Sequence, residues 1–206
     1  MTTTPEAEFS SILCAADGLW EYDPRGKVRI AFLENGTGYL SCSTEMSTFL
    51  GVNFHWSLVA TTTAPPSLLT RLLSPLNIVY PPAQTGTLAI TLVSQDNPTP
   101  APTRPTNAFN TLPLQAPRLQ EWYLTPAAFQ RKTFNVSLQR GSFWPPEVED
   151  AQAAQQAGWV RKYGWWMSWD KSPVPSAEEW TSVKGGPEAN EWWEVRDFVG
   201  WMEGGM

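Results

Sequence analysis

Aromatic side chains are the most prominent chemistry-bearing residues of this chain. Ten of its twelve tryptophans fall between Trp122 and Trp201, some of them in pairs such as Trp165-Trp166. An indole offers a large rigid apolar surface and a single hydrogen-bond donor, whereas the chain has one histidine and two cysteines. This pattern predicts a site for a small hydrophobic or aromatic molecule rather than a metal or a nucleophile. A tryptophan-rich core is the alternative.

Aromatic residues on or beside the expected strands are the candidates for a ligand-binding surface, each as an apolar wall or a stacking partner. They are Tyr39, Trp56, Trp122, Tyr123, Trp165 and Trp166. A barrel of about eight strands holds one small ligand where its own side chains leave the interior open. The prediction therefore depends on how much of the interior the tryptophans occupy.

His55, Glu21 and Tyr123 are the candidates for catalysis. His55 is the only imidazole, which excludes metal sites built on two histidines. It is either a lone general base or an ordinary surface or core histidine. Glu21 follows Trp20, and an apolar neighbourhood raises a carboxyl pKa toward the range of proton transfer; a solvated glutamate is the alternative. No metal site and no cofactor are predicted.

Composition places the chain among folded globular proteins. Its 206 residues, 42% hydrophobic and 17% charged, suit one domain with a substantial core. The net charge of −6 argues against a nucleic-acid partner, because phosphate binding depends on clustered Lys and Arg.

The sequence also predicts a location. The uncharged stretch 46–70 is broken by two prolines and predicts no membrane span. Residues 1–11 lack the pattern of a secretory signal, so we expect a cytoplasmic protein. Cys14 and Cys42 are then expected to be free thiols.

Alternation of apolar and polar residues, the period of a half-buried strand, dominates the chain. Over residues 19–59 it predicts four strands, with the strongest turn signal at Asn35-Gly36, which is typical of a type I′ hairpin. Later runs with the same period lie at 88–92, 122–124, 134–138 and 165–169. About eight antiparallel strands are enough to close an up-and-down barrel without free edges.

Two segments interrupt the strand pattern. Leucines at helical spacing predict a helix over 67–76. Clustered prolines predict a long loop over 94–118.

Residues 145–206 are predicted to form a helical, Trp-rich closing segment. A helix is expected from Pro145 to Gly158, and another at the capping-box spacing of Ser176 and Glu179. A last helix is expected over 188–202. The predicted fold class is therefore mainly β: a single barrel domain over residues 1–206 with short helices, most of them C-terminal.

Several short motifs resemble a known group of barrels. Gly18-Leu19-Trp20 resembles the G-x-W with which lipocalins begin their barrel. The motifs that continue the likeness are Asp23, Arg29-Ile30, Phe32 and Asn35-Gly36-Thr37-Gly38, and near the end Asp170-Lys171-Ser172-Pro173, Pro175 and Glu179-Trp180. Together they resemble small calycin-type proteins of filamentous fungi.

The resemblance implies an up-and-down barrel around a ligand cavity, in a group whose members mostly lack assigned activities. Trp20 is then expected to be a buried plug at the closed end. Fungal barrels of this kind also include cofactor-free cyclases of natural-product pathways.

Three functions stay open. The first is binding of a small hydrophobic or aromatic molecule in the barrel cavity. The second is a cofactor-free cyclisation or isomerisation in a secondary-metabolite pathway, carried out in the same cavity. The third is a protein-interaction module in which Trp192-Trp193 and Arg196 dock a partner, a second copy of the chain included, which would give a homo-oligomer.

Overall fold

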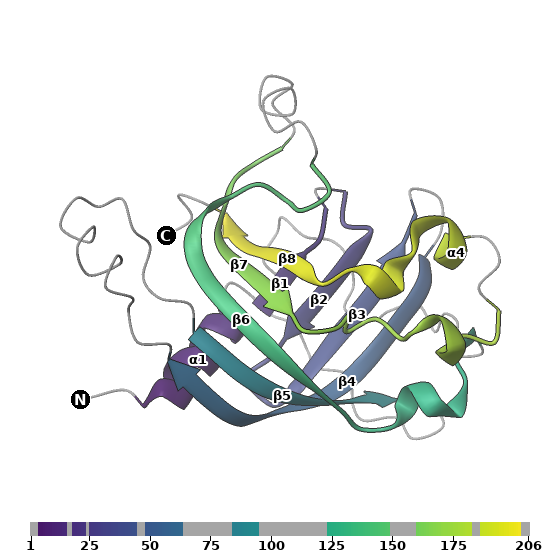
Figure 1. The fold of residues 1–206 in the computed structure, drawn as a ribbon, viewed down its shortest axis with the longest axis horizontal. Helices are drawn as coiled ribbons and strands as arrows, with labels where there is room; N and C mark the ends of the chain where they lie inside the picture. The colour runs from purple at the N-terminus through teal and green to yellow at the C-terminus, as the bar shows by residue number, and fades with distance from the viewer. Residues whose placement is uncertain are drawn as a thin grey trace.

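Eight strands close into an antiparallel barrel in the order in which they occur in the chain (Figure 1). The computed structural model describes residues 4–15, 18–23, 25–44, 48–63, 84–94, 123–148, 160–182 and 186–202. The strands are β1 (Leu19–Glu21), β2 (Val28–Phe32), β3 (Thr37–Ser43), β4 (Thr48–Thr63), β5 (Gln84–Val93), β6 (Lys132–Phe143), β7 (Tyr163–Trp169) and β8 (Asp197–Met202). Each pairs with the one before it, and β8 returns to pair with β1. The prediction of a mainly β, up-and-down barrel is confirmed.

The alternating apolar and polar residues of the strands face opposite sides of the barrel wall. On β4, Leu50 and Val52 are buried, whereas His55 and Ser57 are exposed. Alternate side chains of a strand point to opposite faces, so the apolar set faces the barrel axis and the polar set faces away from it.

The predicted Asn35-Gly36 hairpin joins β2 to β3, but with a different turn. Only Gly36 has a positive φ (79°), whereas a type I′ turn needs two such residues. The Leu33 carbonyl accepts the Gly36 amide (3.1 Å), and the Leu33 amide donates to the Thr37 carbonyl (2.9 Å). The loop is therefore a type I turn followed by a left-handed glycine. The Asn35 side chain favours it by accepting the Thr37 amide (3.0 Å).

The predicted last helix over 188–202 is wrong. The chain there forms a short helix, α4 (Gly186–Asn190), a 3-10 turn, η6 (Trp192–Glu194), and then β8. Without β8 the edges of β1 and β7 would be unpaired, and free edges are costly in a barrel. Closure of the sheet therefore prevails over the helical spacing of the apolar residues.

The predicted strand over 122–124 is also wrong in the part that the structure describes. Leu124 forms only an isolated bridge with Trp180. The segment instead leads into a 3-10 turn, η4 (Pro126–Phe129), because Pro126 sets a turn directly after Thr125.

An N-terminal helix, α1 (Pro5–Cys14), is absent from the sequence prediction. The Thr4 hydroxyl accepts the Ala7 amide (3.3 Å) as its N-cap, and Pro5 occupies its first turn. The buried face of α1 covers one end of the barrel, where the Leu13 carbonyl accepts Nε1 of Trp20 (3.0 Å). We call this end the helix end.

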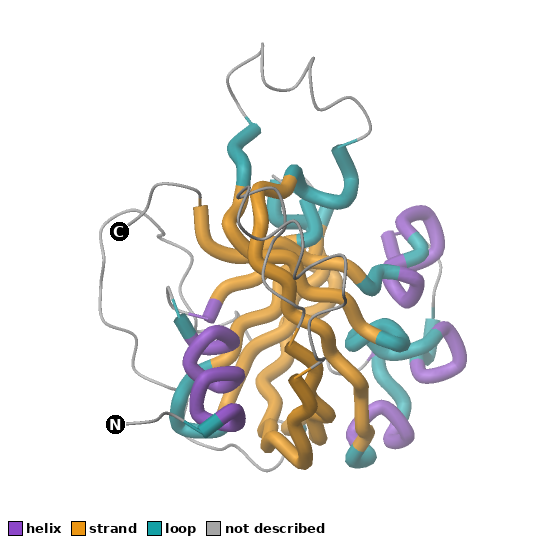
Figure 2. The backbone as a smooth tube through the Cα atoms, turned by 60° about the vertical axis from the view of Figure 1, so that its left-hand side comes forward, coloured by secondary structure: helices purple, strands orange, loops and turns teal. Residues whose placement is uncertain are grey.

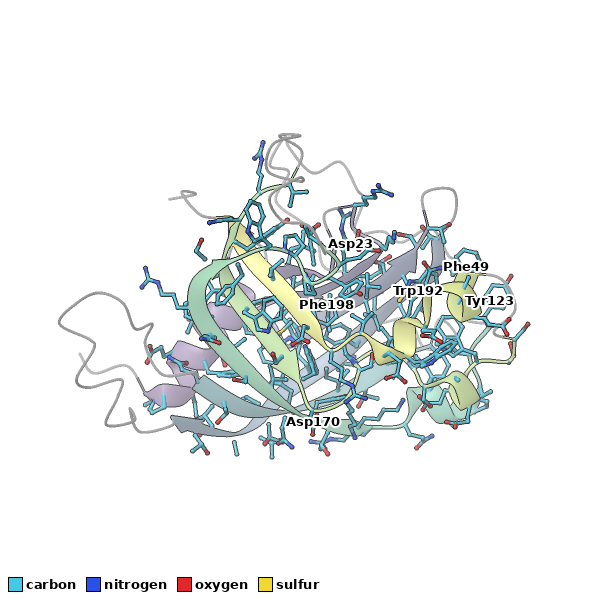
Figure 3. The ribbon with its side chains drawn as sticks, turned by 45° about the horizontal axis from the view of Figure 1, so that its top comes forward. Asp23, Phe49, Tyr123, Asp170, Trp192 and Phe198 are labelled. Carbon is cyan, nitrogen blue, oxygen red and sulfur yellow. The ribbon has the colours of Figure 1, made fainter. Side chains whose placement is uncertain are left out.

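The other end, which we call the tryptophan end, is covered by η4, α4, η6 and a further 3-10 turn, η5 (Ala177–Glu179). Figure 2 shows α1 and these short helices on opposite sides of the strands. Trp192 is buried there against Phe49, with ring centroids 5.6 Å apart (Figure 3). The predicted capping box of Ser176 and Glu179 is confirmed at η5.

Some predictions fall outside the described residues. They include the helix over 67–76, the loop over 94–118 apart from Ser94, and most of the helix after Pro145. Of the helix predicted from Pro145 to Gly158, residues 145–148 are described. They form a turn in which the Val148 amide donates to the Pro145 carbonyl (3.0 Å).

We expect Trp20→Ala to destabilise the fold strongly. The indole is 0% exposed, and it lies so close to Gly200 that a Cβ there would come within 2.7 Å of the ring. Loss of such a side chain lowers the free energy of unfolding by about 3–5 kcal/mol, which denaturant titration measures. Trp166→Ala removes a half-buried indole and should cost clearly less. Equal losses would contradict the role of Trp20 as a plug.

Candidate functional site

Three aromatic rings meet across the barrel interior. Trp169 of β7 stacks on Phe32 of β2 with centroids 6.2 Å apart, and it meets Phe134 of β6 edge-on at 5.4 Å. Because β2 and β7 are not neighbours in the sheet, the Phe32–Trp169 contact spans the interior. At this level the barrel is filled by its own side chains.

Further buried side chains pack on this aromatic layer. Phe32 also packs against Phe54 (5.5 Å) and Trp56 (5.6 Å). Toward the tryptophan end the buried residues at the ends of β2, β3 and β4 are small or aliphatic. They are Val28, Cys42, Leu50 and Val52.

Trp169 places an unpartnered donor in the aromatic layer. Its side chain is 4% exposed, and Nε1 has no hydrogen-bond partner in the described part of the chain. Buried donors are nearly always paired, and an unmade bond costs about 1–3 kcal/mol. By contrast, Nε1 of Trp20 and Nε1 of Trp180 each donate to a backbone carbonyl. In this respect Trp169 differs from Trp20 and Trp180.

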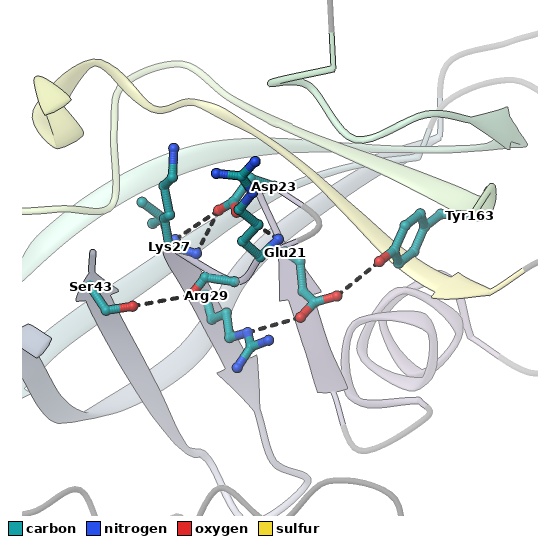
Figure 4. A network of polar contacts seen from close by, with 9 residues as sticks. Glu21, Asp23, Lys27, Arg29, Ser43 and Tyr163 are labelled. Carbon is teal, nitrogen blue, oxygen red and sulfur yellow. Dashed lines mark hydrogen bonds and ion pairs between the residues drawn. The ribbon is translucent and has the colours of Figure 1, made fainter. Parts of the chain in front are cut away.

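A second polar arrangement lies on the face of the wall turned away from the axis. Trp20 faces the interior, so the next residue, Glu21, faces outward. Arg29, opposite Glu21 in the ladder, donates Nε to Oε1 of Glu21 (2.8 Å), and the Tyr163 hydroxyl donates to Oε2 (2.9 Å) (Figure 4). Both oxygens of this half-buried carboxylate are thus engaged.

Tyr39 and Ser41 extend this arrangement onto β3. Ser41 lies opposite Arg29 in the ladder, and its side chain shares a hydrogen bond with Tyr39. Burial raises the pKa of Tyr39 to about 12, although the nearby Arg29 charge acts in the opposite sense. Burial, reinforced by the Glu21 carboxylate, also raises the pKa of Tyr163 well above its ordinary value. Both phenols therefore stay neutral at physiological pH.

Trp166 lies further along the same outer face. Val199 pairs with Glu21 on one side and with Trp166 on the other. Trp166 donates Nε1 to Oγ of Ser168 (2.8 Å) and to Oδ1 of Asp197 (3.2 Å). Val199 is 0% exposed although it faces outward, so this part of the outer face is sheltered from solvent.

Asp23 stabilises the turn between β1 and β2, the strand on which Arg29 lies. Its buried carboxylate accepts the backbone amides of Arg25 (2.8 Å), Lys27 (2.6 Å) and Val28 (3.2 Å). Burial raises the pKa of Asp23, and these amide bonds act against the rise. The W-x-x-D spacing is therefore structural.

The structure distributes the predicted ligand-binding residues over different parts of the barrel. Tyr39 and Trp166 share the outer face, Trp56 and Trp165 pack against the apolar interior, and Tyr123 lies half-buried near the tryptophan end. Trp122 lies outside the described residues. Nε1 of Trp56 donates to the carbonyls of Leu33 and Thr37, so this indole holds the β2–β3 hairpin.

The catalytic candidates also lie apart. Glu21 is held in its ion pair on β1. His55 is exposed on β4, and β2 and β3 lie between β4 and β1. Tyr123 precedes η4 at the tryptophan end. The arrangement does not bring these three side chains to one reacting centre.

Sequence reasoning missed Arg29, Tyr163 and Trp169 as site residues. Arg29 and Glu21 are opposite charges on two consecutive strands, and pairing them across the predicted turn indicates the ion pair. The Tyr163 contact joins β7 to β1, which are distant in the chain. No local pattern shows which indole lacks an acceptor, because that depends on the surrounding strands.

The chain matches no protein-family model, no curated protein and no solved structure. Among the described residues, no group of three His, Cys, Asp or Glu side chains could hold a metal ion. None of the described helices is long and apolar enough to cross a membrane. Cys14 and Cys42 are both free thiols, as expected.

Tyr39 and Tyr163 should make the fold sensitive to high pH. Both pKa values exceed the ordinary 10.0 because burial disfavours the phenolate. A pKa that is higher in the folded state stabilises the fold below the unfolded pKa, and this stabilisation is lost as the pH rises through the folded value. The free energy of unfolding should therefore fall above pH 10.0, the ordinary tyrosine value.

The free energy of unfolding should fall with rising pH by at most about 1.4 kcal/mol per pH unit for each tyrosine, and partial exposure of the phenols reduces this slope. Tyr163→Phe should make the fall shallower in denaturant titrations between about pH 9 and 12. Equal slopes for this variant and the wild type would contradict the burial of the Tyr163 phenol.

Proposed function

We propose that the chain binds a small hydrophobic or aromatic molecule that carries one hydrogen-bond acceptor. The ligand would lie in the half of the barrel interior between the aromatic layer and the tryptophan end. The observation that carries this proposal is the buried Nε1 of Trp169, which has no hydrogen-bond partner among the described residues.

The surroundings of that donor favour a mostly apolar ligand. Phe32 and Phe134 flank the indole, so the neighbourhood supplies apolar contacts and a single donor. A buried water needs about two to four polar partners. An apolar molecule with one carbonyl or ether oxygen would satisfy the donor and also bury its own body.

The composition of the interior supports this location. Val28, Cys42 and Val52, toward the tryptophan end, are small side chains that can be displaced slightly, and the Trp192 ring is buried beyond them against Phe49. Entry at that end would require the segment between β7 and β8 to move. Glu191, at the start of η6, is a non-glycine residue with a positive φ (45°), and this strain favours it as the hinge.

The other two functions have less support. The cyclase hypothesis used His55, Glu21 and Tyr123, which lie apart. The interaction hypothesis used Trp192-Trp193 and Arg196. Trp192 is 1% exposed against Phe49 and offers little surface to a partner, whereas Trp193 is half-buried and Arg196 is exposed. Kinship with fungal calycin-like proteins, a cytoplasmic location and self-association stay predictions from the sequence.

The test compares 2-acetylnaphthalene, which has a ketone acceptor, with 2-ethylnaphthalene, which has a similar shape and none. Calorimetric titration of the full chain should show about 5- to 10-fold tighter binding of the ketone, the value of one hydrogen bond. Trp169→Phe keeps a ring but removes the donor, and it should abolish the preference.

Trp180→Phe is the matched control, because its indole already donates to the Pro175 carbonyl (3.0 Å). This variant should keep the preference for the ketone. Failure of both compounds to bind, or a preference that persists in Trp169→Phe, would count against the proposed site.

A further inference from the structure

The Arg29 guanidinium is held in a fixed orientation on the outer face of the barrel. Glu21 engages its Nε, and Tyr163 fixes the other oxygen of that carboxylate. The guanidinium lies against Gly26, where a Cβ would come within 2.1 Å of Nε, Cζ and Nη2. Gly26 has a φ of 68°, so the turn itself also favours glycine. The site therefore leaves room for the guanidinium at the turn between β1 and β2.

The two terminal nitrogens of Arg29 are its remaining donors. Neither has a hydrogen-bond partner among the described residues, and Figure 4 shows them pointing away from Glu21. The side chain is 22% exposed, so a solute can reach it. A pair of Nη atoms matches the two oxygens of a planar carboxylate, a geometry that a lysine cannot offer.

The neighbours of Arg29 favour an aromatic body over a bare anion. Tyr39 and Tyr163 lie on either side of the Glu21–Arg29 pair, and Ser41 lies opposite Arg29. Aromatic rings attract other rings and the face of a guanidinium. Glu21 and the net charge of −6 oppose a simple anion, so contact with the rings must add to the binding.

We infer that Arg29 binds the carboxylate of a small aromatic acid on the outer face of β1, β2 and β3, with Tyr39 and Tyr163 beside the ring of the ligand. This site is separate from the proposed interior site, because the barrel wall lies between Arg29 and Trp169.

The experiment titrates the full chain with 2-naphthoate, with its neutral analogue 2-naphthamide and with inorganic phosphate. We expect naphthoate to bind at least about 10-fold more tightly than naphthamide, since only the acid can make a charge-assisted bidentate contact. Phosphate should bind more weakly than naphthoate because it lacks a ring. Equal binding of acid and amide, or tighter binding of phosphate, would overturn the inference.

Variants assign the binding to Arg29. Arg29→Gln and Arg29→Lys should each weaken naphthoate binding about 10-fold or more, because the first loses the charge and the second loses the paired donors. Arg196→Gln is the matched control, since Arg196 is an exposed arginine paired with Glu194. Naphthoate affinity that is unchanged in both Arg29 variants would overturn the inference.

Glu21→Gln separates binding from folding. Arg29→Gln leaves Glu21 without its ion-pair partner and can destabilise the fold, whereas Glu21→Gln keeps Arg29 and removes the competing carboxylate. This variant should bind naphthoate several-fold more tightly. Weaker binding by a variant whose thermal melt matches the wild type would contradict the inference. Both Arg29 variants should keep the preference for 2-acetylnaphthalene over 2-ethylnaphthalene, which keeps the outcome for Arg29 distinguishable from the outcome for the interior site.

Discussion

Closure of the barrel depends on the packing of the Trp20 indole on the backbone of Gly200. β1 is only three residues long, and it must pair with β2 on one side and β8 on the other. A side chain at position 200 would collide with the indole, so glycine is required where the ring crosses the ladder. The same indole donates to Leu13 and so attaches α1. The ladder that removes the free edges and the helix that covers one end therefore depend on one side chain.

The wall is a single layer of strands, and successive residues serve its two faces. Trp20 fills the interior while Glu21 holds the outer ion pair, and on β7 Ser168 faces outward while Trp169 faces inward. A shift of the register by one residue would exchange these faces along a whole strand. The apolar interior and the polar outer face are thus products of the same register.

Features that depend on residues close together in the sequence could be predicted, whereas features that depend on residues far apart in the sequence could not. The hairpin at Gly36 and the capping box at Ser176 depend on neighbouring residues, and both were predictable, apart from the turn type. β8 was mistaken for a helix because its apolar residues also fit a helical spacing, and only the need to pair with β1 and β7 decides between the two. α1 was missed because Phe9, Ile12 and Leu13 are its only buried residues, a short pattern among polar neighbours. The contact of Tyr163 with Glu21 joins segments distant in the chain, and no local pattern encodes it.

The ladder between β1 and β8 also affects how the chain folds. Every other ladder of the barrel joins strands that follow each other in the chain, whereas this one joins the two strands that are farthest apart in the sequence. Bringing distant segments together costs chain entropy before any contact repays it, and such contacts slow folding. We expect the sheet to assemble as an open meander and to close in a late step. Until then β1 and β8 are unpaired edges on which two nascent chains can pair with each other, so the folding chain is most prone to aggregate just before it closes.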